Sequence, residues 1–99
     1  MAIESAEETA VGKRWVEETF KRLAGEFKIT ATGFTWRDDF PGPYISTFSF
    51  TVGNTNQPGS IEFRMRQLED CRNVSNRPVR ASLEQQVRDY LQELRQRLG

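Results

Sequence analysis

Two runs of alternating apolar and polar residues, 44–52 and 60–68, dominate the middle of the chain. A period of two is typical of a β-strand with one buried face. The turn-rich segment 53–59 between the runs predicts an antiparallel hairpin. The expected buried face consists of Tyr44, Ser46, Phe48, Phe50, Val52, Ile61, Phe63 and Met65. The opposite face of the sheet is expected to be polar and open to solvent, with Lys28, Thr30, Thr47, Ser49, Thr51, Arg64 and Arg66.

A third strand is predicted over residues 27–37, where the alternation changes phase at Gly33. A β-bulge at this glycine would turn both halves of the run toward the core and bend the strand. Without a bulge, Phe34 and Trp36 would form an exposed stacking platform on the polar face. The bulge is the preferred interpretation.

Amphipathic helices are predicted at both ends of the chain. Two capping-box patterns, at 5–8 and 82–85, predict the first residues of these helices. Gly25 is expected to end the first helix in a left-handed conformation. The segment 69–81 between the last strand and the last helix lacks periodicity and is expected to be an irregular crossover. The last helix carries the most regular apolar stripe, Leu83, Val87, Tyr90, Leu91, Leu94 and Leu98.

The first helix also carries oppositely charged residues at four-residue spacing. The spaced pairs are Lys13 with Glu17, Arg14 with Glu18, Glu17 with Lys21, and Glu18 with Arg22. Such pairs stabilise a helix by a few tenths of a kcal/mol at most. We interpret them as a solvated outer surface that serves solubility.

These elements predict an α+β fold with the order α-β-β-β-α. The three strands form an antiparallel meander, and both helices pack on one face of it, because one apolar sheet face and two apolar helix stripes bury one another. Residues 1–99 therefore form a single domain. This order is similar to that of double-stranded RNA-binding domains over nearly the whole chain. Those domains carry a lysine-rich motif at the start of the last helix, which the corresponding segment 82–88 lacks.

Composition narrows the function classes. Lys plus Arg and Asp plus Glu number 14 each, so no net field attracts the chain to nucleic acid or to an anionic membrane. The single cysteine, Cys71, and the lack of a signal-like segment favour a reducing, cytoplasmic setting. No apolar run approaches the roughly 20 residues of a membrane span. We expect a monomer or a weak homodimer.

Catalysis is not expected. The sequence contains no histidine, the commonest acid–base residue near neutral pH and the commonest transition-metal ligand. Cys71 has no histidine to activate it, and the neighbouring carboxylates Asp38 and Asp39 provide too few oxygens for calcium. We therefore predict no enzyme activity, no metal and no cofactor.

Two binding functions remain. The first is a protein-binding module such as an adaptor, inhibitor or assembly factor, since exposed aromatic and arginine side chains are enriched in interfaces. Its candidate residues are Val11, Trp15, Phe40, Arg72, Arg77 and Arg80. Trp15 lies beside the helix stripe, and either packs against the sheet edge or second helix or contacts the partner. The second function is nucleic-acid binding, with candidates Lys28, Arg64, Arg66, Arg72, Arg77 and Arg80.

Overall fold

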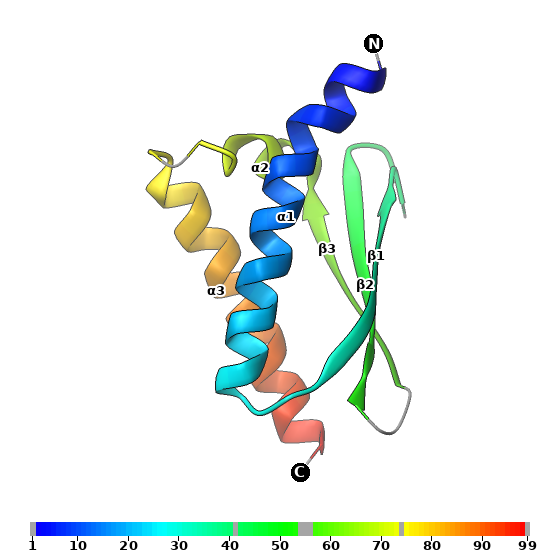
Figure 1. The fold of residues 1–99 in the computed structure, drawn as a ribbon, viewed down its shortest axis with the longest axis vertical. Helices are drawn as coiled ribbons and strands as arrows, with labels where there is room; N and C mark the ends of the chain where they lie inside the picture. The colour runs from blue at the N-terminus through cyan, green and yellow to red at the C-terminus, as the bar shows by residue number, and fades with distance from the viewer. Residues whose placement is uncertain (1, 41, 54–56, 74, 99) are drawn as a thin grey trace.

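The computed structural model describes residues 2–40, 42–53, 57–73 and 75–98 (Figure 1). Three helices and three strands follow one another along this part of the chain. They are α1 (Ala2–Glu26), β1 (Ala31–Asp38), β2 (Ile45–Val52), β3 (Gln57–Arg64), α2 (Met65–Asp70) and α3 (Arg77–Leu98). The middle of the predicted hairpin loop, residues 54–56, lies outside the described residues.

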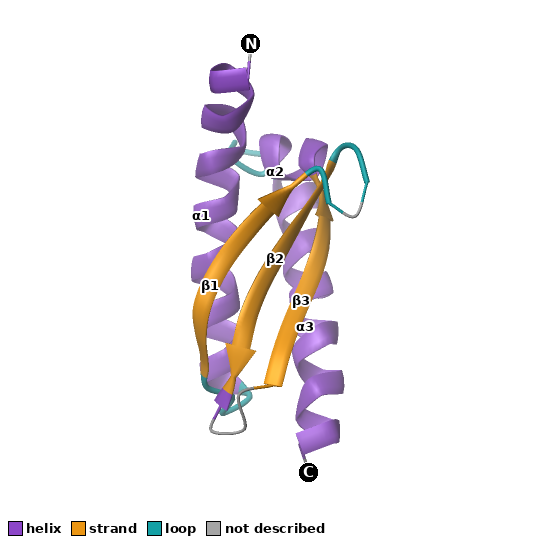
Figure 2. Cartoon of the chain, turned by 90° about the vertical axis from the view of Figure 1, so that its right-hand side faces the viewer, coloured by secondary structure: helices purple, strands orange, loops and turns teal. Residues whose placement is uncertain are grey.

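The sheet is an antiparallel meander in the order β1-β2-β3. All three helices lie on one side of it, behind the strands in the view of Figure 2, and α1 and α3 run side by side. The predicted α+β architecture, with the helices on one face of the sheet, is therefore confirmed.

The core lies between the sheet and the helices. Phe20 of α1 lies at its centre, with ring contacts to Phe48 and Phe50 at centroid distances of 5.3 and 4.6 Å. The fully or nearly buried apolar residues also include Val16, Leu23, Val52, Ile61, Phe63, Leu68, Leu83, Val87 and Leu91. Tyr44 was expected on this buried face, but it precedes β2 and is 78% exposed, so that expectation is wrong.

The predicted bulge in β1 is confirmed. The register between β1 and β2 shifts between Thr32 and Thr35, and Gly33 has φ +68°. As a result Phe34 and Trp36 pack against the core, half-buried. The exposed stacking platform is excluded.

The predicted C-terminus of α1 is wrong. Gly25 is helical, and Lys28 adopts the left-handed conformation, with φ +57°. The amide of Lys28 donates to the Gly25 carbonyl at 3.2 Å and the amide of Ile29 to the Ala24 carbonyl at 2.8 Å, as in a Schellman motif. Buried Ile29 and Ala24 supply the apolar contact that accompanies this motif.

The predicted helix starts are also wrong. The first helix begins at Ala2, before Ser5, and α3 begins at Arg77, five residues before Ser82. Both capping-box sequences therefore lie within helices, and the side chains of 5–8 lie outside the described part of the chain. The segment after β3 contains the helix α2, which was not predicted and begins at Met65. Met65 was expected on the buried face of a strand, but it is half-buried and belongs to this helix.

Helix α2 packs closely against α1. A Cβ built on Gly12 would lie 1.8 Å from the Leu68 carbonyl oxygen and 3.0 Å from the Cys71 sulfur. Only a glycine allows the two backbones this distance. Gly12 therefore fixes how closely α2 and the following residues approach the long helix.

Candidate protein-binding site

One row of side chains on α1 faces the outer strand β1. The row consists of Lys13, Glu17 and Lys21, which contact Asp38, Trp36 and Phe34 in that order. Four-residue spacing on a helix keeps the row on one face, and two-residue spacing on the strand does the same. The sequence interpretation of these charges as helix-internal pairs for solubility was therefore wrong for Lys13 and Glu17, which bind the sheet.

At one end of this row, Lys13 Nζ lies 2.7 Å from an oxygen of Asp38, and the Ser46 hydroxyl donates to the same oxygen at 2.7 Å. Burial raises the pKa of Asp38, but the hydrogen bonds from Lys13 and Ser46 and the lysine charge together lower that pKa below 3.8. In the middle of the row, Trp36 Nε1 donates to Glu17 at 2.7 Å. These contacts hold the C-terminal half of β1 against α1.

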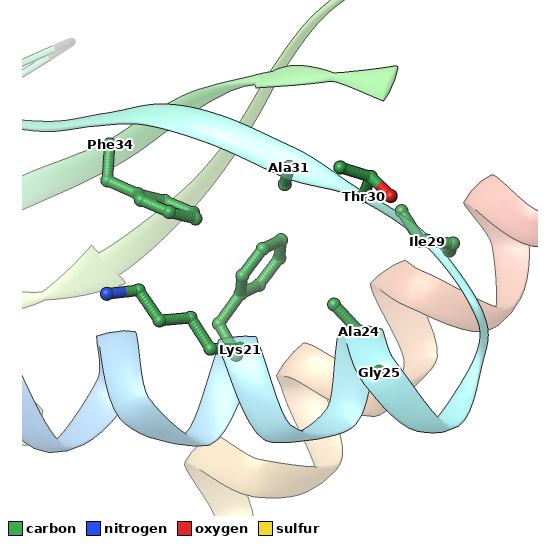
Figure 3. A pocket seen from close by; sticks show the side chains of 8 residues that line it. Lys21, Ala24, Gly25, Ile29, Thr30, Ala31 and Phe34 are labelled. Atoms are coloured by element: carbon green, nitrogen blue, oxygen red, sulfur yellow. The ribbon is translucent and has the colours of Figure 1, made fainter. Parts of the chain in front are cut away.

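At the other end of the row, β1 separates from α1 and leaves a cleft of about 270 Å³. Figure 3 shows Phe34 and Lys21 on one side and Ile29 and Thr30 on the other. The lining residues are Phe20, Lys21, Ala24, Gly25, Ile29, Thr30, Ala31 and Phe34. Lys21 Nζ lies over the Phe34 ring, 5.1 Å from its centroid, and is the one cation among the lining residues. Gly25 lines the cleft without a side chain, and nothing lies within 4 Å of a Cβ built there.

The cleft adjoins the open edge of the sheet. The Thr30 carbonyl accepts from the Gly53 amide at 2.7 Å, so Thr30 directs its backbone groups toward β2. Since these directions alternate along a strand, Ala31 directs its N–H and C=O away from β2. On β2, Gly53 directs its amide toward β1, so by the same alternation Ser49 and Thr47 also face β1. Their partners Thr35 and Arg37 therefore face β2, and Trp36 between them directs its backbone groups outward. In Figure 2 this edge of β1 has no neighbouring strand.

The β3 edge, by contrast, is closed. Pro58 has no N–H to offer at this edge. The Glu62 carbonyl accepts from Gln86 Nε2 of α3 at 2.7 Å, and the Arg64 amide donates to Gln67 Oε1 at 3.4 Å. Proteins commonly block edge strands by such means. The two edges of this sheet therefore differ in their capacity to pair with another strand.

Phe40, two residues after the end of β1, folds back over the outer face of the sheet. Its ring lies under the Arg37 guanidinium, 4.2 Å from the central carbon, and its carbonyl accepts from the Thr47 hydroxyl at 2.6 Å. This cover buries Thr47, so the expectation that the polar face is open to solvent is wrong at Thr47. The expectation is confirmed at Arg64, which is exposed.

The structure places the other predicted protein-binding residues on the helical side. Trp15 is half-buried against the core, and the Arg80 guanidinium lies 5.0 Å from its ring centroid. Arg80 Nε also donates to the Cys71 carbonyl at 2.7 Å. Both side chains thus join α1 to the start of α3. Val11 is 53% exposed beside them, while Phe40 lies on the opposite side of the sheet.

Cys71 is buried in the same junction. Its sulfur lies 3.4 Å from the Leu68 carbonyl and 3.8 Å from the Gly12 carbonyl. Burial raises the pKa of the Cys71 thiol above 9.0, although the nearby Arg80 charge acts in the opposite direction. A buried, protonated thiol is a poor nucleophile.

Among the basic residues proposed for nucleic acid, Lys28 lies apart from Arg64. Lys28 precedes Thr30, which pairs with the end of β2, whereas Arg64 pairs with Ile45 at its start. Arg66 lies on α2, beside the acidic residues of the same helix. Arg72 follows α2, and Arg77 is the first residue of α3. All of these side chains except that of Arg80 are exposed.

Sequence reasoning missed the residues that build the cleft and the open edge. The sequence shows the i,i+4 row on α1 and the phase change at Gly33. It does not show that the fold brings this row and the bulged strand side by side. In the part of the chain that the structure describes, no group of three or more possible metal ligands occurs. No described helix is both long and apolar enough to span a membrane.

Comparison of the chain with protein families, with curated proteins and with solved structures found no match.

Proposed function

We propose that this chain is a small non-catalytic protein-binding module, which adds an extended segment of its partner to the open edge of β1. The observation that carries the proposal is the difference between the two sheet edges. The β3 edge is closed by Pro58, Gln86 and Gln67, whereas Ala31 and Trp36 direct backbone groups outward. Strand addition uses such groups for affinity and adjacent pockets for specificity.

The position of the cleft supports this mode of binding. A strand added beside β1 would turn every second side chain toward the helical layer. The one next to Ala31 and Phe34 would point into the cleft between β1 and α1. A volume of about 270 Å³ is slightly below the roughly 300–1,000 Å³ of sites for whole small molecules. The cleft therefore suits one side chain of a partner.

The proposal can be tested with random peptides displayed on phage and selected on the immobilised chain. The amide resonances that shift on adding a selected peptide should belong to β1 and to the cleft residues. Ala31→Pro removes an outward N–H and should weaken binding several-fold, up to about tenfold, because one hydrogen bond contributes roughly 0.5–1.5 kcal/mol.

Ser60→Pro is the matched control. Ser60 directs its N–H to the closed β3 edge, by the alternation that places the Glu62 carbonyl there. This variant should therefore bind as the unmodified chain does. Selected peptides whose shifts lie around Trp15 and Arg80, or equal losses in both proline variants, would refute strand addition at β1.

We also propose a cytoplasmic setting and a monomer in the absence of the partner. A buried cysteine without a disulfide partner is compatible with a reducing compartment. Nucleic-acid binding is supported less well, because Lys28 and Arg64 lie at opposite ends of the sheet. Labelled single-stranded and double-stranded RNA that bind the chain with a steep salt dependence would favour it instead.

A further inference from the structure

We infer that the segment added to β1 carries an acidic residue beside Arg37 and, five positions away, a large apolar residue that enters the cleft. This inference rests on the proposed strand addition at β1 and specifies the partner's sequence. It follows from the side chains that a new strand would meet on each side of the sheet.

The position of Arg37 on the outer face of β1 favours the binding of a carboxylate. Its guanidinium carbon lies over the Phe40 ring, 4.2 Å from the ring centroid, and the Thr47 hydroxyl donates to the Phe40 carbonyl. A guanidinium that contacts a ring through its face keeps the N–H groups at its rim for hydrogen bonds. In the described parts of the chain no carboxylate lies within ion-pair distance of Arg37, whose side chain is exposed. On the outer face, the residue opposite Arg37 in a new strand would be its direct neighbour.

Other charges around the open edge favour the same partner. The acidic groups of the α1–β1 row are already engaged, Glu17 with Trp36 and Asp38 with Lys13. Lys21, by contrast, faces the Phe34 ring at the cleft and has no carboxylate within ion-pair distance in the described residues. An acidic segment therefore meets uncompensated positive charge at both ends of the site.

The existing neighbour of β1 gives the spacing. Strand β2 places Thr47 opposite Arg37 and Val52 opposite Ala31, so this length of the bulged β1 corresponds to five residues of a neighbouring strand. Thr47 faces outward and Val52 faces the core, as the acidic and apolar residues of the partner would. An antiparallel segment would carry the acidic residue first, and a parallel segment would carry the apolar residue first.

The display selection described above also tests this inference. The peptides recovered should contain Asp or Glu and a large apolar residue at the stated separation. Arg37→Glu should weaken binding of such a peptide at least about tenfold, because it replaces a charged hydrogen bond by repulsion. Changing the acidic residue of the peptide to lysine should restore the affinity for the Arg37→Glu protein.

Two further variants complete the design. Arg95→Glu changes an exposed arginine near the end of α3 and should leave the affinity unchanged. Gly25→Leu places a good helix former in the cleft wall, where a Cβ meets no atom within 4 Å. It should fill the cleft and abolish the preference for a large apolar residue.

The outcomes separate this inference from strand addition itself. Peptides that shift β1 resonances but lack the acidic residue, or that bind the Arg37→Glu protein equally well, would overturn the inference and leave strand addition intact. Peptides that bind elsewhere, or a selection that recovers no binder, would overturn both. A molecular mass that rises with concentration, together with shifts of β1 resonances, would identify a second copy of this chain as the partner. This result would likewise overturn the inference of an acidic partner.

Discussion

The turn after α1 can be tested by two substitutions whose expected signs are unusual. Lys28 adopts a left-handed conformation and Gly25 lies in the helix, although glycine is normally the residue that adopts the left-handed conformation after a helix. Replacing Lys28 by glycine and Gly25 by alanine should therefore both raise the free energy of unfolding.

The expected gains follow from the backbone. A left-handed conformation costs an L-residue about 1–2 kcal/mol, whereas glycine loses roughly 0.5–1 kcal/mol of extra entropy on folding. Lys28→Gly should therefore gain about 0.5–1 kcal/mol. Gly25→Ala should gain a similar amount, about 0.5–1 kcal/mol, from helix propensity. No steric loss opposes it, because nothing lies within 4 Å of the added Cβ.

Urea unfolding followed by circular dichroism measures both gains. In a domain of this size each should also raise Tm by about 2–8 °C. Glu18→Gly, at an exposed position inside α1, is the control and should lose about 1 kcal/mol. If Gly25 ends the helix, as its position in the sequence predicts, then Gly25→Ala will destabilise the protein, and the description of this turn is refuted.

Three other variants test the core, a helix contact and an ion pair. Phe50→Ala should lose about 3–5 kcal/mol in urea unfolding, because Phe50 is only 3% exposed, and wild-type stability would exclude it from the core. Gly12→Ala should lose at least about 1–3 kcal/mol, because its Cβ would overlap the Leu68 carbonyl, and an unchanged Tm would disprove that approach. The pKa of Asp38 is lower in the folded protein than its ordinary value of 3.8. The ionised carboxylate therefore stabilises the fold above pH 3.8, and this stabilisation is lost as the pH falls through the lowered pKa. Asp38→Asn should flatten the fall in stability between neutral and acidic pH, and an unchanged pH profile would contradict the pairing with Lys13.

The sequence predicted the sheet because its signals are local. The alternation around Phe48 and Phe63 gave the strands, and the phase change at Gly33 gave the bulge. The helix boundaries were predicted wrongly because capping sequences are also local, and nothing near Ser5 or Ser82 prevents the helix from continuing in the N-terminal direction.

The candidate site could not be predicted because its parts are distant in the sequence. Glu17 pairs with a side chain 19 residues away and Lys13 with one 25 residues away, so their four-residue spacing suggested pairing within the helix. The cleft is lined by residues of α1 and of the segment 29–34, which the fold brings together from both sides of a turn. Neither segment indicates a cleft on its own.

The closed edge of β3 also limits how the chain can associate with itself. If two copies pair through their β1 strands, each uses its open edge, and the joined sheet ends in a closed β3 edge on both sides. Such a contact produces a finite pair related by a twofold axis, since no edge remains for a third copy. Long fibrils require two open edges on every chain. Substitutions that reopen the β3 edge, which have to change Pro58, Gln67 and Gln86 together, would remove this limit on growth.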